Sequence, residues 1–271
     1  MVELSTIDLL LLRRTFKSMN IDINSYKDDF LRRRIRARML KLKINSFNEY
    51  LRILRRNAEE RLKLLDALAI NVSSFFRDPP VWNFIKHNIF APLFRRAKCS
   101  GKRVRIWSAG CAHGQEPYTI AILSLETMKL IGFKVPVIIY ATDIDEDALA
   151  SARRGIYTVR DIRNVPSAVL NKYFTPLGDG YYGLKSHVKN LVRFKKHDLI
   201  KDNPLLFIDI IFCRNVLIYF QKDAQINILQ KFYKSLTSPG YLILGMSESL
   251  PRSLNNMFKP LSPKYRVYVK G

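Results

Sequence analysis

The sequence predicts an α/β fold, in which a doubly wound, mostly parallel sheet with an antiparallel edge follows an all-α domain. The chain has 271 residues, 48% of them hydrophobic, which is enough for one full α/β core and a smaller companion domain. Residues 1 to about 70 show helical periodicity without a strand signal. Beyond them, apolar runs alternate with helical segments in five β/α units and end in strands only, which favours this sheet.

Residues 1–70 are predicted to be a small helical bundle. The apolar residues recur at helical spacing in three segments, namely Leu9, Leu12, Phe16 and Met19, then Leu31, Ile35, Met39 and Leu42, then Leu51, Leu54, Leu62, Leu65 and Leu68. Seven cations and no acid lie between Leu31 and Lys43. A solvated face would explain such a run. We expect instead a face that binds an anionic partner and is represented by Arg32, Arg36 and Arg38.

A strand, a glycine turn and a helix follow at Val104, and this unit organises the rest of the chain. Gly110 and Gly114 let the backbone pass close to a ligand at the carboxyl end of a strand, and Pro117 opens an apolar helix. The spacing departs from G-x-G-x-x-G and lacks the Lys-Ser/Thr pair of a phosphate loop. A cofactor loop and a plain structural turn both fit these residues.

The next apolar strand, residues 135–145, ends in acids. Asp143 is placed to accept hydrogen bonds from the two hydroxyls of a ribose. The alternative is that Asp143 or Asp145 caps the helix predicted over residues 146–154. Asp143 lies 33 residues beyond Gly110, whereas the dinucleotide pattern expects about 20, so the spacing argues against a dehydrogenase.

The remaining segments complete the prediction. Residues 71–80 are a connector with paired prolines, followed by a helix over about 81–94. Residues 155–190 are too long for a plain crossover and are expected to be a small inserted β-subdomain. Strands are predicted over 191–194, 207–212 and 241–244, with a helix over 223–236, and residues 264–269 are predicted to be a final edge strand.

Composition narrows the classes of protein. The three cysteines and four histidines show no metal-ligand spacing, so we expect no metal site. No apolar run reaches membrane-spanning length and no signal peptide is evident, so we expect a cytoplasmic protein without membrane insertion. The formal charge of +23 should attract nucleic acid, an anionic membrane or an acidic protein.

Four motifs taken together closely resemble the chemotaxis receptor methyltransferases, the CheR family. They are residues 71–77 (NVSSFFR), 107–118 (WSAGCAHGQEPY), 141–145 (ATDID) and 213–220 (CRNVLIYF), and residues 245–250 (GMSESL) also look like that family's closing motif. The likeness covers nearly the whole chain in the family's order. It implies that residues 1–70 recognise substrate, that 71–80 contribute to the active site, and that 81–271 form a Rossmann-like methyltransferase domain that uses S-adenosylmethionine (SAM).

The resemblance also implies a reaction and a set of site residues. The methyl group of SAM would pass to receptor glutamates as γ-methyl esters, leaving S-adenosylhomocysteine. The residues implied around the cofactor are Asn71, Ser73, Arg77, Glu116, Asp143, Asp198, Leu199, Arg214 and Asn215, with Arg77 and Tyr219 nearest the methyl group. The sequence departs from the family at Ser73, where threonine is common, and at Ala112-His113, which replaces Ser-Thr.

The implied partners are the cytoplasmic methylation helices of chemotaxis receptors. By the same resemblance, the loop at residues 176–181 is shorter than in relatives that grip a C-terminal receptor pentapeptide, so we expect no such tether, and we also expect a monomer. Two alternatives from other classes are a SAM-dependent nucleic-acid methyltransferase and a non-catalytic SAM-binding module. The segment Cys213-Arg214-Asn215-Val216 in place of an Asn/Asp-Pro-Pro-aromatic motif argues against the first, and Arg77 with Tyr219 argues against the second.

Overall fold

The structure is a computed structural model that describes residues 4–19, 21–68 and 73–271. The chain divides into two compact units. The first comprises Met1–Ile70 together with Ile218–Asn227, and the second comprises Asn71–Leu217 with Ile228–Gly271. Each unit has its own hydrophobic core, so each is described separately below.

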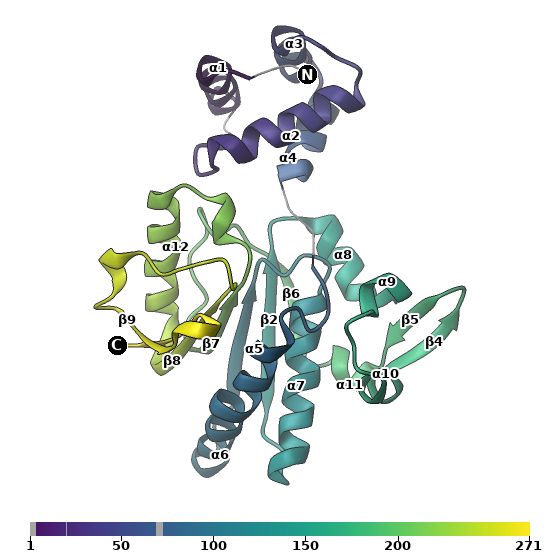
Figure 1. Ribbon diagram of the computed structural model, residues 1–271, viewed down its shortest axis with the longest axis vertical. Coiled ribbons are helices and arrows are strands. Elements are labelled where there is room, and N and C mark those ends of the chain that lie inside the picture. The colour runs from purple at the N-terminus through teal and green to yellow at the C-terminus, as the bar shows by residue number, and fades with distance from the viewer. Residues whose placement is uncertain (1–3, 20, 69–72) are drawn as a thin grey trace. The chain divides into compact units, whose positions relative to one another are not determined.

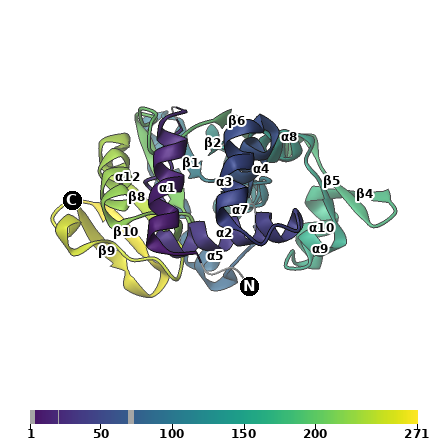
Figure 2. The ribbon, with the colours of Figure 1, turned by 90° about the horizontal axis from the view of Figure 1, so that it is seen from above.

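The first unit is the predicted helical bundle. Its helices are α1 (Thr6–Lys17), α2 (Asp28–Lys41), α3 (Phe47–Arg56) and α4 (Ala58–Leu68). A capping box starts α1, since the Ser5 hydroxyl accepts from the Asp8 N–H at 3.1 Å and the Asp8 carboxylate accepts from the Ser5 N–H at 2.8 Å. Helix α2 crosses α1 and α3, as Figures 1 and 2 show. Leu12, Phe16 and Ile35 are fully buried in the core between them.

Residues 218–227 group with this bundle although they lie far along the chain. The Phe220 ring stacks on Tyr26 with centroids 5.3 Å apart, and the Tyr219 ring lies 5.1 Å from Phe30. The Tyr219 carbonyl also accepts from the Lys27 N–H at 3.0 Å. The aromatic part of the CRNVLIYF motif is therefore anchored to α2 and the segment before it.

Arg38 does not belong to the exposed basic face that the sequence predicted. It is buried beside Glu60, and its Nε donates to Glu60 Oε1 at 3.0 Å. The Tyr50 hydroxyl donates to the same oxygen at 2.9 Å, and burial raises the pKa of Tyr50. Removing one partner of such a buried pair costs about 3–5 kcal/mol, because the other charge is left without compensation. Arg38 is therefore a core residue.

The other exposures on α2 also differ in part from the prediction. The apolar stripe ends at Met39, since Leu40 is 79% exposed and Leu42 is exposed as well. Arg32 is half-buried and donates through Nε to the Leu4 carbonyl at 3.0 Å, whereas Arg33 is exposed. In α4, Leu62 is 60% exposed, so its predicted place in the core is wrong.

The second unit contains the predicted mixed sheet, whose strand order is β6-β2-β1-β7-β8-β10-β9. Its strands are β1 (Val104–Ala109), β2 (Val137–Asp143), β6 (Val192–Lys196), β7 (Ile208–Cys213), β8 (Leu236–Leu244), β9 (Phe258–Ser262) and β10 (Val267–Lys270). The first five strands in the order are parallel, and β10 pairs antiparallel with both β8 and β9. The last strand is thus interior and β9 forms the edge, which corrects the prediction for residues 264–269.

Helices cover both faces of the sheet (Figure 1). They are α5 (Pro79–Ile85), a π-helical turn over Lys86–Phe90, α6 (Ala91–Ser100), α7 (Gln115–Ile131), α8 (Glu146–Arg154) and the part of α12 (Lys222–Ser235) from Ile228 onward. On one face Trp82 of α5 stacks on Phe212 of β7 at 5.6 Å. On the other face Phe232 of α12 meets Trp107 of β1 at 5.2 Å. The chain between β6 and β7 has no helix, which leaves it as an irregular crossing segment.

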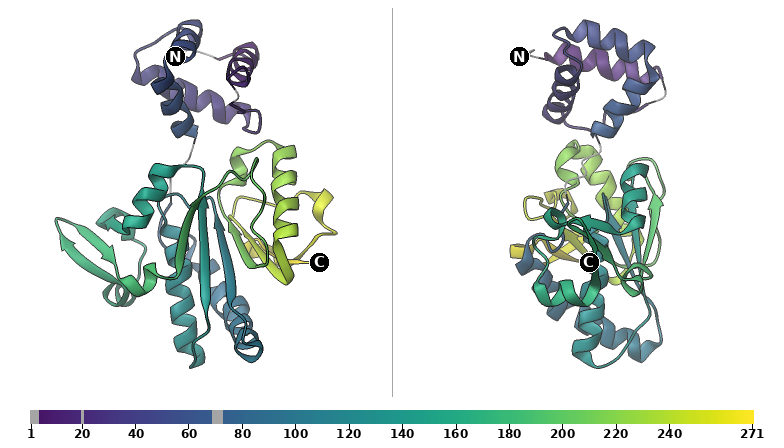
Figure 3. Two further views of the ribbon diagram at one scale, coloured as in Figure 1. Left: turned by 180° about the vertical axis from the view of Figure 1, so that it is seen from behind. Right: turned by 90° about the vertical axis from the view of Figure 1, so that its right-hand side faces the viewer.

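The inserted β-subdomain is also present. Its sheet has the order β3-β5-β4, formed by β3 (Ile156–Thr158), β4 (Phe174–Gly178) and β5 (Tyr181–Leu184), with short helices α9 (Val159–Ile162), α10 (Ser167–Tyr173) and α11 (Ser186–Lys189). The β4–β5 hairpin extends away from the large sheet (Figures 1 and 3). Phe75 makes edge contacts with Tyr157 at 4.8 Å and Phe174 at 5.4 Å, so the segment before α5 is packed on this subdomain.

Candidate functional site

The loop after β1 is held close to its neighbours by its glycines. Gly110 and Gly114 have φ of 79° and 88°, and Ala112 between them is also left-handed. A Cβ on Gly110 would lie 2.5 Å from a methyl of Val216, and one on Gly114 would lie 2.9 Å from Ala152. Larger residues would therefore force the loop away from the β7 and α8 segments.

Asp143 and Asp145 divide the two roles that the sequence left open. Asp145 caps α8, since its carboxylate accepts from the Ala148 N–H at 3.0 Å. Asp143 accepts from the Ala112 N–H at 2.8 Å and from the Asp145 N–H at 3.1 Å. Burial raises the pKa of Asp143, while these backbone donors act in the opposite direction. Asp143 thus joins the tip of β2 to the glycine loop.

A buried charge network lies beside this loop. The Arg214 side chain, only 2% exposed, is 2.7 Å from the Asp78 carboxylate and 3.7 Å from that of Glu116, and its guanidinium lies 5.0 Å from the Trp82 ring centroid. The Ser108 hydroxyl donates to Glu116 at 2.7 Å. Burial raises the pKa of Glu116, and Arg214 opposes that shift. Arg214 therefore favours the charged form of Glu116 against the effect of burial.

Arg77 lies on a strained turn at the start of α5. Its neighbours Phe76 and Asp78 have φ of 50° and 55°, a region that costs a non-glycine residue about 1–3 kcal/mol. The Arg77 carbonyl accepts from Trp82 Nε1 at 2.7 Å and from Arg214 Nη2 at 3.2 Å. These contacts fix the backbone at Arg77 against the buried network.

Glu248 is a residue whose role the sequence did not reveal. Its buried carboxylate accepts three backbone N–H groups, from Asn215 at 2.8 Å, Val216 at 2.9 Å and Gly245 at 2.7 Å. It therefore joins the loop after β7 to the loop after β8 and holds Asn215 at a φ of 61°. The sequence signal that could have revealed this role is an acid in the closing motif, three residues after the glycine that follows a buried strand.

Asp198 and Leu199 follow β6, next to the tip of β2. The His197 N–H donates to the Asp143 carbonyl at 2.9 Å, and the Asp198 carboxylate accepts from the Ile200 N–H at 2.8 Å. Lys231 of α12 donates to the Leu199 carbonyl at 3.2 Å. Burial lowers the pKa of His197, which favours the neutral ring.

The second unit therefore brings most of the predicted cofactor residues to the carboxyl ends of the parallel strands. These are Arg77, Glu116, Asp143, Asp198, Leu199, Arg214 and Asn215. Ser73 is half-buried in the irregular segment before α5, and the predicted Asn71 lies outside the described residues. Tyr219, Arg32 and Arg36 belong to the first unit.

The polar atoms at this edge suit a polar, charged ligand. His113 Nδ1, Gln115 Oε1 and Arg214 Nε are buried without a hydrogen-bond partner among the described residues. Such atoms are costly unless a ligand or water satisfies them. SAM carries an α-amino acid, a sulfonium and ribose hydroxyls, so the acids and the arginine offer matching partners.

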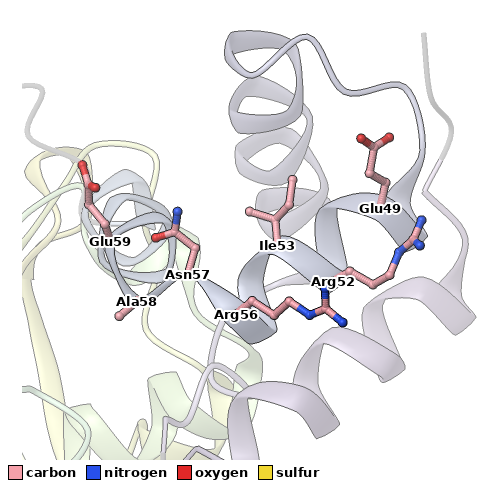
Figure 4. Close-up of a pocket in the computed structure, with 7 residues that line it drawn as sticks. All are labelled: Glu49, Arg52, Ile53, Arg56, Asn57, Ala58 and Glu59. Atoms are coloured by element: carbon pink, nitrogen blue, oxygen red, sulfur yellow. The ribbon is translucent and has the colours of Figure 1, made fainter.

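A separate open pocket of about 740 Å³ lies in the first unit (Figure 4). It is lined by Glu49, Arg52, Ile53, Arg56, Asn57, Ala58 and Glu59. None of the predicted site residues lines this pocket. Within the ranges that the structure describes, no cluster of His, Cys, Asp or Glu could hold a metal, and no helix is long and apolar enough to cross a membrane.

We expect Glu248→Gln to loosen the loops after β7 and β8, because the amide replaces an acceptor oxygen with a donor that faces N–H groups. Hydrogen exchange at Asn215, Val216 and Gly245 should become faster. The matched control is Asp209→Asn, because Asp209 accepts from the Arg105 N–H at 2.8 Å and from the Thr237 hydroxyl at 3.1 Å at the opposite end of the strands. Unchanged exchange at the three amides in Glu248→Gln would show that the carboxylate does not hold these loops.

Comparison with known proteins places both units in one family. The model described as "CheR methyltransferase, SAM binding domain" matches residues 71–267, and "CheR methyltransferase, all-alpha domain" matches residues 10–69. The chain is 34% identical over 254 residues to the chemotaxis protein methyltransferase of Borreliella burgdorferi, covering 90% of this chain and 88% of the relative.

Two further relatives are similar to this chain over most of its length, although one of them is a much longer protein. The chain is 34% identical over 242 residues to chemotaxis protein methyltransferase 2 of Vibrio cholerae, covering 88% of this chain and 83% of that protein. It is 32% identical over 251 residues to an uncharacterized 104.1 kDa protein of Rhodobacter capsulatus, covering 93% of this chain but 26% of that longer protein. The chain belongs to the CheR methyltransferase family and is a SAM-dependent methyltransferase.

Proposed function

We propose that this methyltransferase transfers the methyl group of SAM to the γ-carboxylates of glutamates on chemotaxis receptors, forming methyl esters for sensory adaptation. The observation that carries the proposal is the gathering of residues from four family-like motifs at one edge of the sheet, around Asp143, Glu116, Arg214 and Arg77. The relatives named chemotaxis protein methyltransferase support the receptor as substrate.

We assign Asp143 to the ribose hydroxyls of SAM. Each of its oxygens accepts one backbone N–H and keeps a second lone pair for a ligand hydroxyl. Glu116 and Arg214, which face each other in the buried network, would hold the amino acid end of SAM. Ser73, Asp198, Leu199, Asn215 and Asn71 complete the proposed cofactor set.

The reaction requires the protein to align the substrate with the methyl group more than it requires a general base. SAM supplies an electrophilic methyl group on a sulfonium, and a glutamate with a reference pKa near 4.3 is already a nucleophile at neutral pH. We assign Arg77 to the substrate carboxylate, which its guanidinium can bind through two hydrogen bonds. Its strained, well-anchored backbone suits a positioning role, since alignment for in-line attack is what raises the rate. Tyr219 is assigned to the transfer path.

Receptor recognition is proposed for the basic face of α2. Arg32 and Arg36 remain in this assignment, while the buried Arg38 is replaced by the exposed Arg33 and Lys41. The expected partner is a glutamate-bearing receptor helix, bound by a monomer in the cytoplasm without a C-terminal pentapeptide tether. Exposed ion pairs contribute about 0–1 kcal/mol each, so this face should act collectively.

The test of the function is incubation with methyl-labelled SAM and receptor cytoplasmic fragments. We expect label that is released by base, because esters hydrolyse and N-methyl groups do not.

Arg77→Ala and Tyr219→Phe should lower the single-turnover rate more than the affinity for S-adenosylhomocysteine, since both are assigned to the methyl group and its acceptor. Base-stable label would reject glutamate esterification, and near-normal rates in both variants would remove these residues from the active site.

Asp143→Ala should weaken SAM binding by about 1.5–3 kcal/mol, the usual loss for a hydrogen bond to a charged acceptor. Asp145→Ala is the matched control, because it removes the α8 cap from the same strand end and should cost about 1 kcal/mol of stability with SAM affinity intact. Calorimetric titration separates the two. Equal SAM affinity in folded Asp143→Ala would move the ribose contact elsewhere.

Arg33→Gln combined with Arg36→Gln should raise the KM for receptor several-fold and leave SAM affinity unchanged, because two cations leave the proposed face. The control is Arg52→Gln with Arg56→Gln on α3, which changes the charge of the same unit equally. Steady-state kinetics at low and high salt provide the measurement. If both pairs of substitutions change KM alike, net charge rather than the α2 face governs receptor binding.

A further inference from the structure

A strongly basic segment lies at the amino end of the large sheet, opposite the candidate site. Residues 95–105 contain six cations, and residues 86–107 contain no acid. Lys98 lies in the last turn of α6, and Lys102 and Arg103 lie in the exposed turn that leads into β1. None of these residues belongs to the proposed cofactor set.

The turn between α7 and β2 adds to the same surface. The Val104 N–H donates to the Pro136 carbonyl at 2.9 Å, so the start of β1 lies beside the segment that carries the exposed Lys134. Helices α6 and α7 pack together and end at this edge (Figure 1). Lys129, also exposed, lies in the last turn of α7.

Exposed apolar side chains lie among these cations. Leu130, at the end of α7, is 54% exposed. Strand β7 pairs with β1, and just before it Leu206 is 51% and Phe207 70% exposed. Phe207 also has a φ of 59°, which is an outlier for a bulky side chain. A ring that is mostly exposed, on a strained backbone, contributes little to the packing of this unit.

Helix capping explains only part of the charge. Lys98 and Lys129 lie in last turns, where cations favour the helix dipole. Lys102, Arg103 and Lys134 lie beyond the helix ends, in adjacent segments where like charges repel one another. Their clustering opposes stability unless an anionic partner compensates for it.

We propose that this surface, formed by Lys98, Lys102, Arg103, Lys134, Leu130 and Phe207, is a docking site for an anionic lipid bilayer. Clustered lysines and arginines are drawn to anionic headgroups, and nearby apolar side chains can enter the interface without a membrane span. Leu130 and Phe207, with the exposed Leu206 beside Phe207, favour lipid over the phosphates of nucleic acid, which make no favourable contact with apolar side chains. The proposal does not depend on the receptor substrate, because vesicle binding is measured without receptor.

The test is co-sedimentation of the full chain with phosphatidylcholine vesicles that contain or lack phosphatidylserine. Binding should require phosphatidylserine and fall as salt rises. Lys102→Gln with Arg103→Gln should lower the vesicle partition coefficient by about tenfold or more. The control is Arg160→Gln with Arg163→Gln, two exposed cations of the β-subdomain, which change net charge equally and should leave partitioning unchanged. Both double variants should bind S-adenosylhomocysteine like the parent.

Phe207→Asn is the sharper variant, because asparagine tolerates the left-handed backbone. It should raise Tm by about 2–4 °C while lowering vesicle affinity, a combination that lost folding could not produce. Equal losses in the Lys102/Arg103 and Arg160/Arg163 variants, or equal binding to vesicles without phosphatidylserine, would overturn the proposal. So would an absence of vesicle binding together with duplex DNA binding that depends on Lys102 and Arg103, which would identify a nucleic-acid surface.

Discussion

The position of the loop after β1 is the constraint on which the candidate site depends. The N–H groups of Gly110 and Cys111 both donate to the Thr142 carbonyl, at 2.8 and 2.9 Å, and the Ala112 N–H donates to Asp143. Parallel pairing of β1 with β2 and β7 puts the three following loops at one edge. A shift of this loop would move Asp143, Glu116 and Arg214 out of their present arrangement at the same time, because the position of each depends on the loop.

Acids and an arginine lie together at this edge of the sheet, whereas cations outnumber acids at the other edge. Arg214 is buried and lies 2.7 Å from the Asp78 carboxylate and 3.7 Å from that of Glu116, so one cation faces two acids. Removing Arg214 would leave the buried Glu116 carboxylate without its cation. The amino edge instead presents a cluster of cations and exposed apolar residues, with Asp209 hydrogen-bonded to the Arg105 N–H among them. The same strands therefore support two chemically different surfaces.

The acids of the carboxyl edge show why residue type alone does not determine role. Asp143 and Asp145 are two residues apart, yet one joins the loop to β2 and the other caps α8. Glu248 accepts three hydrogen bonds from the N–H groups of Asn215, Val216 and Gly245 and so serves as a backbone acceptor. In each case the neighbouring N–H groups decide what the carboxylate does. They come from the same helix for Asp145, but from another loop for Asp143 and Glu248.

The sequence by itself determined the α/β class, the helical domain before it, the β-insertion and the family, because hydrophobic periodicity and the glycine, acid and CRNVLIYF motifs are local signals. Only the tertiary structure decided that Arg38 is buried with Glu60, that β10 lies inside the sheet with β9 at the edge, and that Glu248 holds two loops together. Residues 31, 35 and 38 share a helical stripe, but a cation on it could face either water or a buried acid. Whether the cation is exposed or buried depends on which residue of another helix or strand packs against it. The spacing of residues along the chain does not carry that information.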